Sequence, residues 1–165
     1  MSYIINDILS AMNYLPIGIM CGFLGTAMHY ILKSKVVNKK TCIFEFFLIT
    51  YLTAVLFIAL LSREPGSRDM VSLIPFSTFG TTPQSHAYVV ENIIMFIPFG
   101  FLLPLLWTRM NNLYFCLLTA FFTSLAIEVT QVITKMGYGQ TDDVITNVLG
   151  AAVGFGILRI IQKVK

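Results

Sequence analysis

Long apolar stretches separated by short polar segments dominate the chain and set its predicted architecture. A bilayer core about 30 Å thick needs about 20 mostly apolar residues in a helix that rises about 1.5 Å per residue. Five stretches meet this requirement: residues 14–32, 43–61, 89–107, 113–133 and 143–161. The pattern therefore predicts an all-α fold, a polytopic transmembrane helical bundle of about five spans that forms one domain over residues 1–165.

Two of the predicted spans differ from the other three. The third begins with Glu91 and Asn92 and contains Pro98 and Pro104, so we expect it to be kinked. The fifth is the least apolar and contains three glycines, which let another helix approach closely. We therefore expect the fifth helix to pack inside the bundle rather than face lipid.

Composition supports the membrane assignment and excludes other classes of protein. Hydrophobic residues make up 56% of the chain and charged residues 12%, against roughly 25% charged in soluble domains. A soluble protein of 165 residues exposes a large fraction of its surface and needs more polar residues than this. The net charge of +3, without a basic stripe, disfavours nucleic acid as a partner. Three cysteines are too few for an extracellular disulfide scaffold.

The charged residues predict an orientation in the membrane. Cells leave the lysines and arginines of short loops on the cytoplasmic side. With the N-terminus outside and the C-terminus inside, eight of the eleven lysines and arginines lie inside. Seven of the eight acidic residues then fall on the outer side or in the outer halves of helices. Because acidic residues contribute little to topology, insertion does not explain this asymmetry, and another reason is needed.

The longest connection, residues 62–88, is predicted to lie on the outer face. Its apolar run at 71–76 is too short to span a bilayer and is typical of a re-entrant or interfacial segment. His86 falls in this predicted loop, where it could join acidic groups. One histidine with carboxylates is weak evidence for a metal site, so we predict no metal and no cofactor.

Polar residues inside the predicted spans fall on helix faces that converge in the outer leaflet. A charged side chain at the centre of a membrane helix costs roughly 2.5–3.5 kcal/mol, so it must face the bundle interior or water. Ser124, Glu128 and Gln131 share one face of the fourth span, at i, i+4 and i+7. Asp143 and Asn147 share a face of the fifth span. The short connection makes these two spans antiparallel neighbours.

We therefore predict one polar pocket in the outer leaflet, roofed by the connection at 62–88. The predicted binding residues come from the last three spans and their connection: Glu91, Asn92, Glu128, Gln131, Asp142, Asp143 and Asn147. Simpler roles are available for two of them. Asp142 stands where a helix N-cap is expected, and Asn147 can hydrogen-bond a neighbouring helix.

Three segments carry short motifs in a fixed order. They are residues 73–76 with 92–100, residues 128–131, and residues 143–150 followed by Gly154. In order and spacing these segments resemble the VanZ-like family of small bacterial membrane proteins, named for teicoplanin resistance, over about residues 60–160. The family motif maps to Asn92, Pro98, Gly100, Glu128, Gln131, Asp143, Asn147 and Gly150. Many members also carry an arginine and a further aspartate before the last motif, and residues 137–141 contain neither.

The resemblance implies a multi-pass protein of the bacterial cytoplasmic membrane, associated in part with resistance to lipid-bearing glycopeptide antibiotics. It implies no particular reaction. We favour an accessory protein of the cell envelope whose pocket binds a membrane lipid or a lipid-linked envelope molecule, with a lipoglycopeptide antibiotic as a second candidate partner.

Two alternatives to an accessory protein stay open. The first is an enzyme that acts on a lipid-linked substrate, with Glu128 and Asp143 as its catalytic acid and base, because neighbouring carboxylates separate their pKa values. The second is a proton-coupled carrier, for which only His29 and Glu45 continue a polar path inwards. His29 shares its helix face with three glycines, which we interpret as a close-packing face.

Overall fold

The computed structural model describes residues 12–33, 38–61, 66, 71–77, 79 and 82–164. In this part of the chain, five helices are long and apolar enough to cross a membrane, which confirms the predicted class and number of spans. They are α2 (Leu15–Leu32), α3 (Lys39–Leu56), α4 (Pro83–Leu106), α5 (Leu113–Thr134) and α6 (Thr141–Val164). A π-helical turn, η1 (Phe57–Leu61), extends α3, and a 3-10 turn, η2 (Thr108–Asn111), precedes α5.

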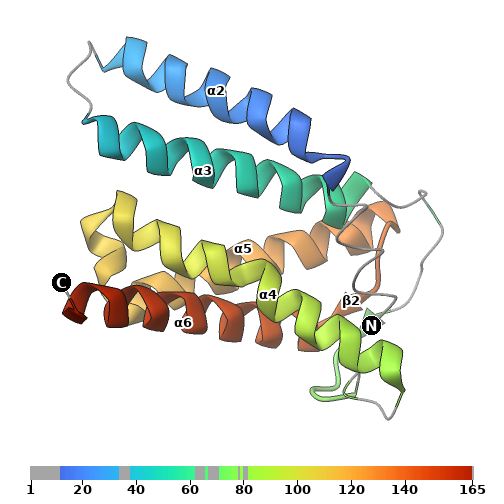
Figure 1. Ribbon diagram of the computed structural model, residues 1–165. Helices are drawn as coiled ribbons and strands as arrows, with labels where there is room; N and C mark the ends of the chain where they lie inside the picture. The colour runs from blue at the N-terminus through green and yellow to red at the C-terminus, as the bar shows by residue number, and fades with distance from the viewer. Residues whose placement is uncertain are drawn as a thin grey trace.

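Two short strands mark one end of the bundle, which we call the strand end. β1 (Val71–Ser72) lies between η1 and α4, and β2 (Gly139–Gln140) lies between α5 and α6. The two strands pair in parallel, with Val71 opposite Gly139. Figure 1 shows β2 where α6 begins and the C-terminus at the opposite end of the bundle. The strand end is the predicted outer side.

Helix α4 begins six residues earlier than predicted. The Thr82 side chain accepts a hydrogen bond from the Ser85 backbone N–H, and a proline opens the helix, where a missing N–H forfeits no helical bond. The prediction that His86 lies in a loop is therefore wrong, because His86 is exposed in the first turn of α4. The helix continues through Pro98 and Pro104.

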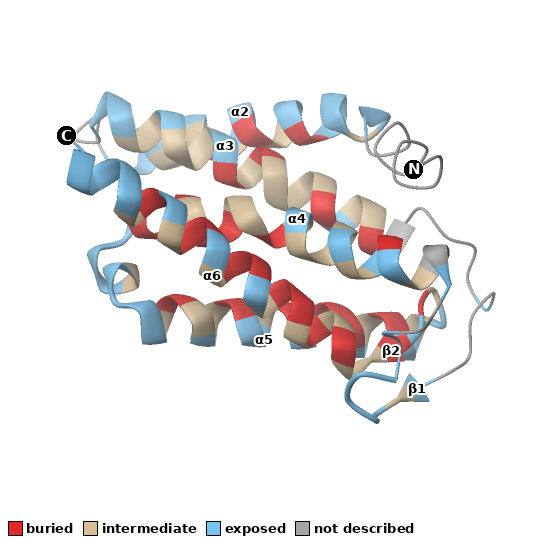
Figure 2. Ribbon diagram, turned by 60° about the horizontal axis from the view of Figure 1, so that its bottom comes forward, coloured by how far each residue is buried: buried red, intermediate tan, exposed pale blue. Residues whose placement is uncertain are grey.

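Helix α6 is the most buried of the five spans, as its glycines predict. It contacts both α4 and α5, and buried residues run along much of its length in Figure 2. A Cβ atom on Gly150 or Gly154 would come closer than 3.0 Å to a backbone carbonyl oxygen of α4, and one on Gly100 would do the same to α6. The α4 and α6 backbones thus meet directly, which side chains at these positions would prevent.

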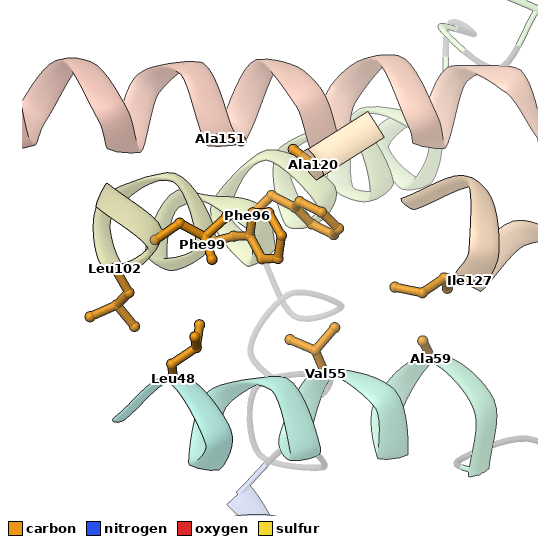
Figure 3. Close-up of a cluster of buried hydrophobic side chains, with 10 residues drawn as sticks. Leu48, Val55, Ala59, Phe96, Phe99, Leu102, Ala120, Ile127 and Ala151 are labelled. Atoms are coloured by element: carbon orange, nitrogen blue, oxygen red, sulfur yellow. The ribbon is translucent and has the colours of Figure 1, made fainter. Parts of the chain in front are cut away.

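The remaining two helices form a hairpin that packs on this group of three (Figure 1). The glycine face of α2 contacts α3, where a Cβ on Gly18 would lie 2.7 Å from the Thr50 carbonyl oxygen. At the other end of the hairpin, His29 Nδ1 lies 2.7 Å from Glu45 Oε2. Figure 3 shows the core that joins the two layers, with Val55 of α3 across from Phe96 of α4. The predicted close-packing role of the glycine face is confirmed.

Candidate functional site

A hydrogen bond deep in the bundle sets the register of α5 against α6. Asn147 Nδ2 donates to Ser124 Oγ over 2.8 Å, and the two side chains are 2% and 0% exposed. One turn closer to the strand end, α5 carries Glu128 and α6 carries Asp143. Since the two helices are antiparallel, these carboxylates lie at the same level of the helix pair. We call Ser124, Glu128, Asp143 and Asn147 the polar row.

Asn147 has one polar atom that the protein leaves without a partner. Its Oδ1 is buried, and the described residues supply no hydrogen bond to it. Asn147 lies six residues into α6, about 9 Å along the axis from the helix start. A buried amide oxygen without a hydrogen bond typically costs about 1–3 kcal/mol, so a donor that reached Asn147 Oδ1 would stabilise the bundle.

Glu128 links α5 to β2 at the strand end of the bundle through a hydrogen bond. Its side chain is 7% exposed, and Oε2 accepts a hydrogen bond from the Gln140 backbone N–H over 2.9 Å. Gln140 belongs to β2, so this carboxylate holds the connection that leads into α6. An intramolecular hydrogen bond typically contributes about 0.5–1.5 kcal/mol, which offsets part of the cost of burying this carboxyl group.

Asp142 holds a segment from the other connection over the helix ends. Residues 71–77, which we call the roof segment, begin with β1 and approach the start of α6. The Phe76 backbone N–H donates to Asp142 Oδ1 over 2.5 Å, and Asp142 is 1% exposed. Thr141 Oγ1 adds a longer bond of 3.5 Å to the Ser72 carbonyl oxygen. Asp142 therefore joins two connections, a role beyond that of a helix cap.

The roof segment presents apolar side chains to its surroundings. Leu73, Ile74 and Phe76 are 76%, 71% and 64% exposed. Exposed apolar residues at the end of a membrane bundle suit the boundary between headgroups and acyl chains. The structure thus agrees with an interfacial segment at the strand end. Residues 62–65, 67–70, 78, 80 and 81 of the predicted roof lie outside the described residues.

Gln131 turns away from the polar row. Its Nε2 donates to the carbonyl oxygen of Ala59 in η1 over 2.9 Å, and the side chain is 6% exposed. Its position on the face of Ser124 and Glu128 predicted a place in the shared pocket. The hydrogen bond instead braces α5 against the end of α3.

Glu91 and Asn92 are only partly brought to the predicted site. They lie in the third turn of α4 rather than at its start, which corrects the predicted position. Contacts of Gly150 with Ile93 place them near the level of Asn147. With about 100° per residue, however, both lie off the side of α4 that carries Ile93 and contacts α6. Both side chains are half-buried.

A groove lies on another face of α5, since at about 100° per residue its α5 lining is centred roughly 150° around the helix from Ser124 and Glu128. It encloses about 520 Å³ between the end of α3 with η1 and one face of α5. Its lining includes Leu56, Leu60, Phe122 and Ile127, and none of the seven predicted binding residues. The described residues contain no group of three or more His, Cys, Asp or Glu side chains that could hold a metal ion.

Some partners in this arrangement have no signal in the sequence. Three of them are backbone groups that form hydrogen bonds with the predicted polar side chains: the N–H groups of Phe76 and Gln140 and the carbonyl of Ala59. Their role depends on contacts between distant segments. Ser124 is different, because its place on the face of Glu128 marks it in the sequence.

Comparison with known proteins gives one match. The family model described as VanZ/LLP1 matches residues 42–162, from α3 to the last turns of α6. No match was found among curated proteins or solved structures. Since the matched region covers most of the chain and includes every predicted binding residue, the chain belongs to the VanZ/LLP1 family.

Proposed function

We propose that this protein is an accessory protein of the bacterial cell envelope that binds the polar headgroup of a membrane lipid, or of a lipid-linked envelope molecule, at its strand end. The observation that carries the proposal is the buried Asn147 amide, whose Oδ1 has no partner among the described residues. It stands at the deep end of the polar row, below Glu128 and Asp143. Oxygen acceptors predominate in this row, so a headgroup with hydroxyl or ammonium donors complements it.

The roof segment supports a lipid rather than a water-soluble ligand. Its exposed Leu73, Ile74 and Phe76 favour the membrane interface, and the bond from Phe76 to Asp142 keeps this segment beside the start of α6. The predicted orientation makes this the outer leaflet. By covering an envelope lipid there, the protein would reduce access of a teicoplanin-type antibiotic to its target, in line with the resistance for which the family is named.

An enzyme acting on a lipid-linked substrate is the second candidate. The bond between Ser124 and Asn147 supports it, because residues one turn closer to the strand end on each helix, Glu128 and Asp143, then share one level of the helix pair. A carrier receives less support, because the His29–Glu45 pair lies between α2 and α3 and the polar row lies between α5 and α6.

Lipid mass spectrometry of the purified protein tests the proposal. A binding protein should co-purify with an enriched lipid, lose it in Asn147→Leu, and keep it in Glu128→Gln, since glutamine retains an acceptor for the Gln140 N–H. Glu45→Gln, a carboxylate change in α3, serves as the matched control and should have no effect.

Two results would decide against this function. Equal lipid content in the wild type and in Asn147→Leu removes the support for a headgroup site. Chemical conversion of the lipid by the wild type, abolished in Glu128→Gln while the protein still inserts and binds, establishes the enzyme instead.

A further inference from the structure

We infer that the groove between the end of α3 and α5 holds one acyl chain of a membrane lipid. Leu56 and Leu60 form one wall, and the face of α5 from Thr119 to Thr130 forms the other, around about 520 Å³. The inference rests on the proposed function in one respect, because it takes the bound lipid to have its headgroup at the strand end. The groove itself is argued from its own residues.

The chemistry of the lining selects hydrocarbon. Leucine, phenylalanine, isoleucine and alanine side chains provide most of the surface. Threonines add hydroxyl groups, but Thr119 Oγ1 donates to the Phe115 carbonyl oxygen over 2.8 Å, and Thr130 Oγ1 donates to that of Ala126 over 2.7 Å. These two hydroxyl groups therefore donate their hydrogen bonds to backbone carbonyls of their own helix. The groove thus offers an occupant apolar contacts and few directed hydrogen bonds.

The groove runs along the middle of α5. Thr119 and Thr130 are eleven residues apart on α5, which corresponds to about 17 Å along the helix axis. Thr130 lies four residues from the strand end of α5, at Thr134, and Thr119 lies six residues from its other end, at Leu113. The groove is therefore centred near the middle of the span, and its length is close to half of a hydrocarbon core of about 30 Å. An acyl chain that descends from the strand-end leaflet past the bilayer centre would lie along it.

The groove opens sideways to the bilayer. Phe122 and Leu56, on its two walls, are 58% and 44% exposed, while Ile127 at its floor is 5% exposed. Both walls belong to candidate membrane spans, so their exposed surface meets lipid. A chain can therefore enter from the hydrocarbon core without passing through water.

A polar brace lies at the strand-end limit of the groove. The bond from Gln131 to the Ala59 carbonyl links α5 to η1 one residue beyond Thr130. π-helical turns such as η1 occur frequently at functional sites. A lipid with its headgroup at the strand end can accordingly place its chain along this side of α5.

Photo-crosslinking tests the assignment. The full chain is reconstituted in vesicles of phosphatidylethanolamine and phosphatidylglycerol that contain phosphatidylethanolamine with a diazirine midway along one acyl chain. After irradiation, mass spectrometry locates the labelled residues. Labelling should be several-fold higher at the groove lining than at Leu118 and Leu125, which are exposed on α5 but lie outside the groove. Ala126→Phe fills the groove and should lower that labelling several-fold.

Leu125→Phe adds a ring on the same helix outside the groove and should leave the labelling unchanged. If Ala126→Phe does not fold, Ala126→Leu fills part of the groove and should give a partial loss. Equal labelling of groove and lipid-facing residues, or an unchanged pattern in a folded Ala126 variant, overturns the inference. Concentrated groove labelling in a wild type that co-purifies with no enriched lipid keeps the acyl site and refutes only the headgroup site.

Discussion

Because of the contact between α4 and α6, we expect alanine substitutions at two glycines of α6 to affect stability differently. A Cβ on Gly154 would lie closer than 3.0 Å to the Ile97 carbonyl oxygen, 2.9 Å from its carbon and 3.0 Å from the Phe101 nitrogen. All three atoms are backbone and cannot move aside as a side-chain end can. A Cβ on Gly156, two residues further, meets nothing within 4 Å. Gly156→Ala is therefore a matched control for Gly154→Ala.

The two substitutions should have different effects on the free energy of unfolding. Overpacking of a tight interface typically destabilises a protein by about 1–3 kcal/mol, and a rigid obstacle favours the upper end of that range. Alanine gains up to about 1 kcal/mol over glycine in a helix interior. We expect Gly154→Ala to lower the free energy of unfolding by about 2 kcal/mol after this gain. Gly156→Ala should leave it unchanged or raise it by up to about 1 kcal/mol.

Thermal unfolding measured with a thiol-reactive fluorogenic dye provides the assay. Cys116 is 0% exposed and its Sγ lies 4.0 Å from the Gly100 carbonyl oxygen, so it reacts only when α4 separates from α5. Cys21 and Cys42 are partly exposed and are first replaced by serine. A destabilisation of about 2 kcal/mol corresponds to a Tm lower by about 4–8 °C at this chain length. Equal Tm values for the two variants would refute the direct contact of the α4 and α6 backbones.

Further predictions concern the roof segment, the hairpin and the orientation. Asp142→Ala removes the acceptor of the Phe76 N–H, so hydrogen–deuterium exchange at 71–77 should rise while α2 and α3 stay unchanged; slow exchange at 71–77 would contradict this role. Glu45→Ala removes the hydrogen-bond partner of His29 and should lower the Tm without changing lipid retention, and a loss of lipid would show that the two sites are coupled. A green fluorescent protein fused to the C-terminus should fluoresce and an alkaline phosphatase fusion should be inactive, because positive charges predict a cytoplasmic C-terminus; the converse result places the strand end inside.

The lengths of apolar runs predict the helices well, because burial in hydrocarbon depends on local composition. Five spans occur where apolar residues persist for about 20 positions. The ends are less accurate where polar residues continue a helix. Residues 83–88 are partly polar, yet Thr82 caps them into α4 beyond the apolar run.

The predicted site likewise has a part that the sequence indicates and a part that it does not. Helical periodicity alone puts Ser124 with Glu128 and Asp143 with Asn147, and the short connection makes them neighbours. The family membership is likewise readable in the sequence and is confirmed. A face, however, specifies a direction and not a partner. Gln131 lies on the predicted face but binds the Ala59 carbonyl, 72 residues earlier in the chain.

By itself, then, the amino-acid sequence determined a helical membrane protein with acidic and amide groups on particular faces of its last two spans. Only the tertiary structure decided that Asp142 holds Phe76, 66 residues away, and that a groove lies between α3 and α5. The physical reason is that hydropathy and helical periodicity act over a few turns. Backbone partners and the spaces between helices depend on how distant segments pack.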